Sequence, residues 1–236
     1  MQVVILAGGL GSRLRPLTAR IPKPMAPVAG APYLEHQLRL LARQSLRDVV
    51  ILTGYLGEQI EEYFGDGRRL GLEIQYSREG QPLGTGGALR HARPLLAESF
   101  LVIYGDSYLP VEYGDVGRQL TNSTALAVMA VYHDPFGETN VRPNVALSHG
   151  GEVLRYDKKA PAGDHGMEYV EAGVLALRRA VLALIPGVGT CSLEETVFPF
   201  LIEGRQLLGY PAKQRFYDIG TFAGLGVFSR EVRKKG

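Results

Sequence analysis

The residues best suited to chemistry stand near the start of the chain, just after a short apolar run. Aliphatic residues 3–6 lead into a Gly-Gly-Leu-Gly-Ser segment at 8–12, and the cations Arg13 and Lys23 follow it. The free N–H groups of a glycine-rich loop after a strand bind anions, and neighbouring cations strengthen that binding. The segment therefore predicts a phosphate-binding loop.

Two common phosphate-binding motifs are similar in sequence to this loop, but neither matches it. A P-loop requires Gly-Lys-Ser/Thr after four spacer residues, and no such sequence occurs here. A dinucleotide fingerprint beginning at Gly9 and Gly11 requires a small third residue, where Leu14 stands. A P-loop ATPase is therefore disfavoured, and a dinucleotide-dependent enzyme stays a weak alternative. An ordinary surface turn would not need the cations around this loop.

Composition narrows the class of protein. The 236 residues are 45% hydrophobic and 21% charged, which suits one globular domain with a sizeable core. The net charge is +2 and the only basic block is 233–235, so we expect binding neither to nucleic acid nor to a membrane. No apolar stretch reaches the roughly 18 residues of a membrane span. The single Cys191 is compatible with a reducing cytoplasm, where we expect the protein to reside.

The elements that must position these residues alternate in the first half of the chain. Short apolar or alternating runs predict strands at 2–7, 48–53, 72–76 and 100–104. Periodic or glycine-led segments predict helices at 32–44, 58–64 and 84–96. Strands alternating with helices favour an α/β fold, a three-layer Rossmann-like, mostly parallel sheet flanked by helices.

The second half has more strand character. It predicts strands at 125–132, 145–147, 153–156, 169–177 and 207–210. It also predicts helices at 180–184, 193–203 and 221–233. Because no linker or composition break divides the chain, we expect a single domain over 1–236. Its nucleotide-binding half would be 1–110 and its second-substrate half 111–236.

Several polar residues directly follow predicted strands. Glu79 and Asp106 occupy such positions, as does the glycine-rich loop. Ligands of parallel sheets bind at the carboxyl ends of the strands. All three features could therefore face one crevice.

Longer motifs resemble the sugar-1-phosphate nucleotidyltransferase family. The first is Leu-Ala-Gly-Gly-x-Gly-Ser-Arg-Leu at 6–14, followed by Pro-Lys-Pro-Met at 22–25. Further similar motifs stand at 82–88, at 105–106 and, as Tyr-Asp-Ile-Gly-Thr, at 217–221. The resemblance covers nearly the whole chain in order. Residues 24–28 and the 217–221 motif look like the short bacterial enzymes of the D-glycero-α-D-manno-heptose 1-phosphate guanylyltransferase type.

This resemblance implies a reaction. The phosphate of a sugar 1-phosphate attacks the α-phosphorus of a nucleoside triphosphate, giving a nucleotide sugar and pyrophosphate. Both reactants are anionic, so positioning and cations do most of the work and no protein nucleophile is needed. The implied substrates are GTP and D-glycero-α-D-manno-heptose 1-phosphate. A mannose 1-phosphate guanylyltransferase, or a uridylyl- or thymidylyltransferase for another sugar, is the alternative.

The resemblance also implies roles for particular residues. Arg13 would hold the β- and γ-phosphates, and Lys23 would bridge the α-phosphate and the sugar phosphate. Asp106 and Asp218 would bind Mg²⁺, which takes one or two carboxylates together with phosphate oxygens. The implied nucleotide-binding residues are Leu6, Ala7, Gly8, Gly9, Gly11, Ser12, Glu79, Pro82, Gly84 and Thr85.

The sugar phosphate side departs from the family pattern at two places. Asp157 and Lys158 match a Glu-Lys-Pro motif, with Lys158 on the phosphate and Asp157 on a sugar hydroxyl, but Lys159 remains a rival because the register could shift by one. Glu171 and Gly173 stand where relatives carry Asn-x-Gly. Glu171 would accept a hydrogen bond from the sugar. These departures leave the identity of the sugar open.

Two further points concern the base and the class of function. The Glu79 carboxylate accepts but does not donate hydrogen bonds, so it suits the two N–H donors on the edge of guanine better than uracil or thymine. A non-catalytic sugar-nucleotide-binding regulatory protein is the alternative class, but it would not need both Asp106 and Asp218. A homo-oligomer is possible through the apolar segment 222–228.

Overall fold

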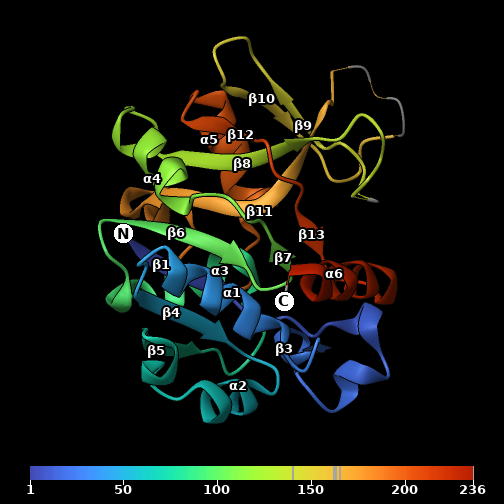
Figure 1. The fold of residues 1–236 in the computed structure, drawn as a ribbon. Coiled ribbons are helices and arrows are strands. Elements are labelled where there is room, and N and C mark those ends of the chain that lie inside the picture. Colours follow the sequence, from blue (N-terminus) through green and yellow to red (C-terminus); the bar gives the residue numbers. More distant parts are fainter. Residues whose placement is uncertain (140, 162–163, 165, 236) are drawn as a thin grey trace.

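A nine-stranded sheet forms the centre of the computed structural model, which describes residues 1–139, 141–161, 164 and 166–235 (Figure 1). Among these residues the strand order is β10-β9-β11-β6-β1-β4-β5, with β8 on β11 and β12 on β8. The strands are β1 (Gln2–Leu6), β4 (Asp48–Thr53), β5 (Glu73–Arg78), β6 (Ser99–Tyr104), β8 (Ala127–His133), β9 (Val145–Leu147), β10 (Val153–Tyr156), β11 (Tyr169–Arg178) and β12 (Leu207–Ala212).

The strands of the first half run parallel, as the alternating pattern predicts. Ile5 of β1 lies opposite Ile51 of β4 and Ile103 of β6, and β4 pairs in parallel with β5. Successive side chains of a strand point to opposite faces, so Val3 joins one hydrophobic core and Val4 the other. Helices cover both faces, and the predicted mostly parallel, three-layer α/β fold is confirmed.

The helices are divided between the two faces of the sheet. Those on the Val3 face are α1 (Tyr33–Arg43), α2 (Gly57–Phe64) and α4 (Tyr113–Thr121). Those on the Val4 face are α3 (Gly84–His91) and α5 (Phe198–Glu203). In α1 the predicted stripe of Leu34, Leu38 and Leu41 is fully buried.

Antiparallel pairing joins the two halves of the chain. Val174 of β11 lies opposite Ile103 of β6, and the predicted hairpin of β9 and β10 is present. The pairing of β11 with β8 shifts register between Glu171 and Leu175. Gly173 lies in this bulge with φ +73°, where a Cβ would collide with Ser107. The bulge therefore depends on glycine at this position.

Several elements differ from the sequence expectation. Helix α4 was not predicted, because its two glycines lower helix propensity, but Tyr113, Val116 and Leu120 are buried at helical spacing. The hairpin of β2 (Pro27–Val28) and β3 (Ala31–Pro32) and the pair of β7 (Ser107–Tyr108) and β13 (Tyr217–Asp218) were also not predicted. The helix expected at 193–203 is a π-helical turn, η7 (Leu193–Val197), followed by α5. Its expected cap is present, since the Glu195 N–H donates to Ser192 Oγ at 3.2 Å.

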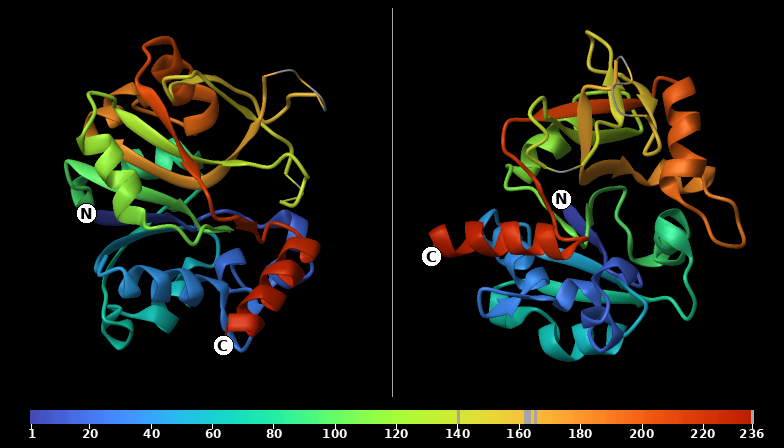
Figure 2. Two further views of the ribbon diagram at one scale, coloured as in Figure 1. Left: turned by 45° about the horizontal axis from the view of Figure 1, so that its top comes forward. Right: turned by 90° about the vertical axis from the view of Figure 1, so that its right-hand side faces the viewer.

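The C-terminal helix α6 (Phe222–Lys235) packs beside the N-terminal segment that holds β2 (Figure 2). Phe228 is fully buried, with its ring centroid 5.2 Å from that of Tyr33 and 4.8 Å from that of Tyr108. Phe222 is 53% exposed. The segment 222–228 therefore contributes to the core of its own chain, and a homo-oligomer stays a prediction. Within the described residues, no helix is long and apolar enough to cross a membrane.

We expect Phe228→Ala to lower the free energy of unfolding by about 3–5 kcal/mol, because it empties a filled aromatic site. Urea denaturation measures this change. Phe222→Ala is the matched control on the same helix, and it should change stability by less than about 0.5 kcal/mol because the side chain is half exposed. Equal losses for the two variants would contradict the packing described.

Candidate active site

Two adjoining cavities open near the carboxyl ends of β1 and β6. The first has a volume of about 330 Å³ and the second of about 430 Å³. Tyr104, Asp106 and Lys158 line both cavities, and we call these three residues the dividing wall. The N-terminal and C-terminal halves of the sequence thus meet at one place in the fold.

Most of the predicted site residues line one cavity or the other. Besides the dividing wall, those at the first cavity are Leu6, Ala7, Gly8, Gly9, Lys23, Glu79, Pro82, Gly84 and Thr85. Those at the second cavity are Arg13, Glu171, Gly173 and Asp218. The first cavity thus holds most of the predicted nucleotide-binding residues, and the second holds Glu171 and Gly173 of the predicted sugar phosphate set. Arg13 is the exception, since it lines the second cavity although the resemblance implied a role on the triphosphate.

Three predicted residues line neither of these cavities. Gly11 has φ +60°, and a Cβ there would collide with Thr18 and Lys23, so glycine allows the loop its turn at this position. Ser12 is exposed at the start of a 3-10 turn. Asp157 lines a separate hollow with Lys159, whose N–H donates to Asp157 Oδ1 at 2.7 Å. At the predicted Asp157-Lys158-Lys159 motif, it is thus Lys158 that reaches the cavities.

The strand pair β7–β13 brings Asp106 and Asp218 together. Asp218 lies opposite Ser107, and the Ile219 N–H donates to the Asp106 carbonyl at 2.9 Å. Burial and then the negative charge of Asp106 raise the pKa of Asp218. Two neighbouring carboxylates that repel each other are stabilised by a divalent cation, and Mg²⁺ accepts such a pair together with phosphate oxygens. The donor set fits Mg²⁺, although no group of three or more His, Cys, Asp or Glu suited to a metal occurs in the described part of the chain.

Cations surround this aspartate pair. Lys23 Nζ forms an ion pair with Asp106 Oδ2, and the Lys23 side chain is only 12% exposed. The Arg13 guanidinium lies near Asp218 at Gly220, where a Cβ would approach Arg13 Nη2 to 2.6 Å and Asp218 Oδ1 to 2.7 Å. Glycine at 220 therefore leaves room for both groups.

Glu79 also lines the first cavity. Its N–H donates to the Thr53 carbonyl at 2.9 Å, which extends the sheet pairing by one residue, and its Oε2 accepts the Leu83 N–H at 3.1 Å. A Cβ on Gly8 would lie 2.7 Å from Glu79 Oε1. Glycine at position 8 therefore admits the carboxylate beside the loop. Burial raises the pKa of Glu79.

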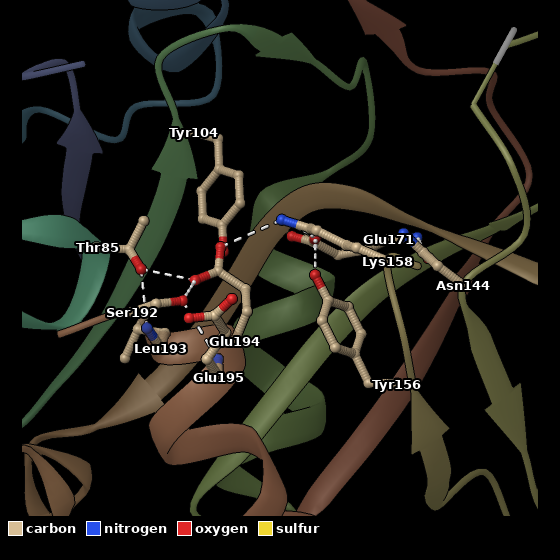
Figure 3. A network of polar contacts seen from close by, with 10 residues as sticks. All are labelled: Thr85, Tyr104, Asn144, Tyr156, Lys158, Glu171, Ser192, Leu193, Glu194 and Glu195. Atoms are coloured by element: carbon tan, nitrogen blue, oxygen red, sulfur yellow. Dashed lines mark hydrogen bonds and ion pairs between the residues drawn. The ribbon is translucent and has the colours of Figure 1, made fainter. Parts of the chain in front are cut away.

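Lys158 lies between two carboxylates (Figure 3). Its Nζ is 3.3 Å from Glu194 Oε1 and 3.5 Å from Glu171 Oε2. The Lys158 side chain is half exposed, whereas that of Glu171 is 4% exposed and that of Glu194 is 10% exposed. The ammonium group of Lys158 is thus held at the cavity surface by ion pairs with both carboxylates.

Glu171 also has polar neighbours from β10 and from the residue that precedes β9. Its Oε2 accepts the Tyr156 hydroxyl at 2.9 Å, and its N–H donates to Asn144 Oδ1 at 2.8 Å. Its Oε1 is buried and has no hydrogen-bond partner among the described residues. Burial raises the pKa of Glu171. An acceptor is therefore left over at the second cavity.

Sequence reasoning missed Tyr104 and Glu194 as site residues. Glu194 belongs to a Ser-Leu-Glu-Glu segment, which indicates only the start of a helix. Tyr104 is the last residue of an apolar strand, and nothing in its spacing marks it. Thr85, which we predict to contact nucleotide, lines the first cavity, and its hydroxyl donates to Glu194 Oε2 at 2.7 Å.

The sequence of the chain is similar to those of known proteins along nearly its whole length. The sequence profile of the family described as "Nucleotidyl transferase" matches residues 2–235. The chain belongs to this family. The chain is 33% identical over 227 residues to "Mannose-1-phosphate guanylyltransferase" of Mycobacterium tuberculosis. The alignment covers 94% of this chain and 61% of that protein. The chain is also 31% identical to "D-glycero-alpha-D-manno-heptose 1-phosphate guanylyltransferase" of Aneurinibacillus thermoaerophilus, over 93% of both chains. The resemblance to this group of nucleotidyl transferases is confirmed.

Solved structures share the nucleotidyl transferase fold. HddC from Yersinia pseudotuberculosis superimposes with a TM-score of 0.81 at 23% identity, covering 98% of this chain and 99% of that one. A putative glucose-1-phosphate thymidylyltransferase from Bacillus anthracis has a TM-score of 0.85 at 21% identity, covering 99% and 95%. At these identities the likeness concerns the fold alone.

Proposed function

We propose that this nucleotidyl transferase transfers GMP from GTP to D-glycero-α-D-manno-heptose 1-phosphate. The observation that carries the proposal is the dividing wall, where Asp106, paired with Lys23, and Lys158 lie between two cavities of substrate size. GTP would occupy the first cavity and the sugar 1-phosphate the second. A sugar phosphate oxygen forms the new bond to the α-phosphorus, and the bond to the leaving pyrophosphate breaks.

The residues of the chain would act by position and charge. Lys23 holds the α-phosphate at the wall, Lys158 holds the incoming phosphate, and Arg13 lies on the side of the second cavity. Such cations lower the repulsion between two anionic reactants, and no covalent intermediate with the protein is required. Asp106 and Asp218 would hold Mg²⁺, which when bound neutralises charge on the phosphates.

The sugar would lie beside Glu171 and Gly173. The buried, unpartnered Oε1 of Glu171 suits a hydroxyl donor of the sugar, and the bulge at Gly173 brings the backbone of β11 to the cavity. Support for a heptose comes from the relative of equal length, and support for a mannose alternative comes from the longer mycobacterial relative, of which this chain spans 61%. A reaction that consumes nucleoside triphosphate is expected in the cytoplasm.

A substrate matrix tests the proposal. Each of GTP, ATP, UTP, CTP and dTTP is combined with heptose, mannose and glucose 1-phosphates, and pyrophosphate release is measured with Mg²⁺. The highest kcat/KM is expected for GTP with the heptose 1-phosphate. No release with any pair, together with tight binding of a nucleotide sugar, would favour the non-catalytic regulatory alternative.

Glu79→Gln is expected to lower kcat/KM for GTP by about 10- to 100-fold and to narrow its advantage over UTP. Glutamine can still accept the Leu83 N–H, but it offers one acceptor fewer to the two N–H donors of guanine. Rates with GTP and UTP measure the change. Glu58→Gln, half exposed on α2, is the control for removing a carboxylate. An unchanged GTP-to-UTP ratio would exclude Glu79 from base selection.

A further inference from the structure

Glu194 is a buried carboxylate, and both of its oxygens accept hydrogen bonds from donors in several segments of the chain (Figure 3). Its Oε2 accepts the hydroxyls of Thr85 and Ser192 at 2.7 and 2.6 Å. Its Oε1 accepts the Tyr104 hydroxyl at 2.8 Å and faces Lys158 Nζ at 3.3 Å. Because three hydroxyls fix both oxygens, this carboxylate cannot turn away from the lysine.

The charge state of Glu194 agrees with these contacts. Burial would raise its pKa, but the Lys158 ammonium and the hydroxyls of Ser192 and Thr85 lower the pKa to about 2. The side chain is therefore an anion at neutral pH. It contributes a fixed negative charge beside Lys158 in the first cavity, which Glu194 also lines.

Lys158, in contrast, has little to fix it apart from its two carboxylates. Its side chain is half exposed on a flexible stem. The rings of Tyr104 and Tyr156 lie 5.6 and 5.8 Å from its Nζ, so they limit its sideways movement. Without Glu194, the remaining anion would be Glu171, which is in the second cavity and 3.5 Å away. The ammonium would then be drawn from the wall toward the sugar side.

We propose that Glu194 is a positioning residue for the transfer reaction, which holds the Lys158 ammonium at the dividing wall where the sugar phosphate must meet the nucleotide. This inference rests on the proposed function. Glu194 also lines the first cavity, but both of its oxygens already accept hydrogen bonds from the protein, so we expect its effect on catalysis to run through Lys158.

A double-mutant cycle tests this dependence. Glu194→Gln keeps the shape of the side chain and is expected to raise the KM for sugar 1-phosphate about tenfold while changing the KM for the nucleotide less than about twofold. In a Lys158→Met background the same change should have no further effect. Equal losses in the two backgrounds would overturn the proposal. The adjacent, exposed Glu195→Gln is the matched control and should behave like the wild type.

The pH profile separates positioning from a merely structural role. The groups facing Lys158 are Glu171 from β11, Glu194 from η7, Tyr104 from β6 and Tyr156 from β10. Burial would lower the pKa of Lys158, but the two carboxylates raise it above its ordinary value. Glu194→Gln should therefore move the alkaline limb of kcat/KM to lower pH, and Glu194→Asp should restore it. A uniform loss at every pH, with an unmoved limb, would contradict the proposal.

Binding measurements test the role of Glu194 even if the proposed function is wrong. If the wild-type protein turns over no substrate pair, the proposed function fails. Calorimetric titration of the wild type, Glu194→Gln, Lys158→Met and the double variant with mannose 1-phosphate then decides the role of Glu194. Weaker binding in Glu194→Gln but no additional loss in the double variant supports it, and independent losses overturn it. Thermal unfolding of each variant confirms that it is folded.

Discussion

Replacement of Asp106 by asparagine is expected to reduce kcat at least about 10³-fold, the largest effect in this protein. Asp106 lies at the dividing wall, beside Asp218, and it is one of two carboxylates suited to Mg²⁺. Asparagine keeps the shape but removes the charge, so the cation would lose a principal ligand. Pyrophosphate release at saturating substrates measures the effect, and chelation of Mg²⁺ from the wild type should have a similar one.

The control for this variant is Asp66→Asn, a change of the same kind at an exposed site. It should leave kcat unchanged, and both variants should keep the wild-type unfolding temperature within a few degrees. A titration with Mg²⁺ adds a second measurement, because Asp106→Asn should require far more metal for any residual turnover. Wild-type kcat in Asp106→Asn would remove this residue from the metal site.

Lys23→Ala is expected to reduce kcat by about 10²- to 10³-fold, the range for losing one fixed charge that acts on the transition state. The side chain is nearly buried at the first cavity and its ammonium pairs with Asp106, which lines both cavities, so water cannot replace it as a fixed cation. Single-turnover kinetics with GTP measures the chemical step directly. Nucleotide binding should weaken much less than turnover.

The ion pair between Lys23 and Asp106 requires one precaution. Removal of Lys23 leaves Asp106 without its cation, which favours Mg²⁺ binding there. The variant should therefore be assayed over a range of Mg²⁺ concentrations. Lys213→Ala is the control, because that lysine is exposed. If Lys23→Ala loses only affinity for GTP and keeps kcat, Lys23 binds substrate without stabilising the transition state.

Much of the fold follows from local sequence patterns. Apolar runs and helical stripes identify the parallel strands and α1, because these elements are held by side chains close together in sequence. The glycine-rich loop, Glu79 and Asp106 could be placed at one edge of the sheet from their positions after strands. Helix α4 was missed although Tyr113, Val116 and Leu120 stand at helical spacing, because its two glycines lower the helix propensity of the segment.

The sequence by itself predicted a phosphate-binding loop at residues 8–12, its position at the end of a parallel strand, and the family that the chain resembles. Only the tertiary structure decided which residues from later in the chain lie at the same site as this loop. The pairing of β7 with β13 brings Asp218 to Asp106, and the contact of Thr85 with Glu194 spans 109 residues of sequence. Such contacts depend on strand register and on packing against several elements at once, so no local spacing encodes them. For that reason Lys23 could be recognised from its motif, whereas the carboxylate that holds Lys158 became visible only in the folded chain.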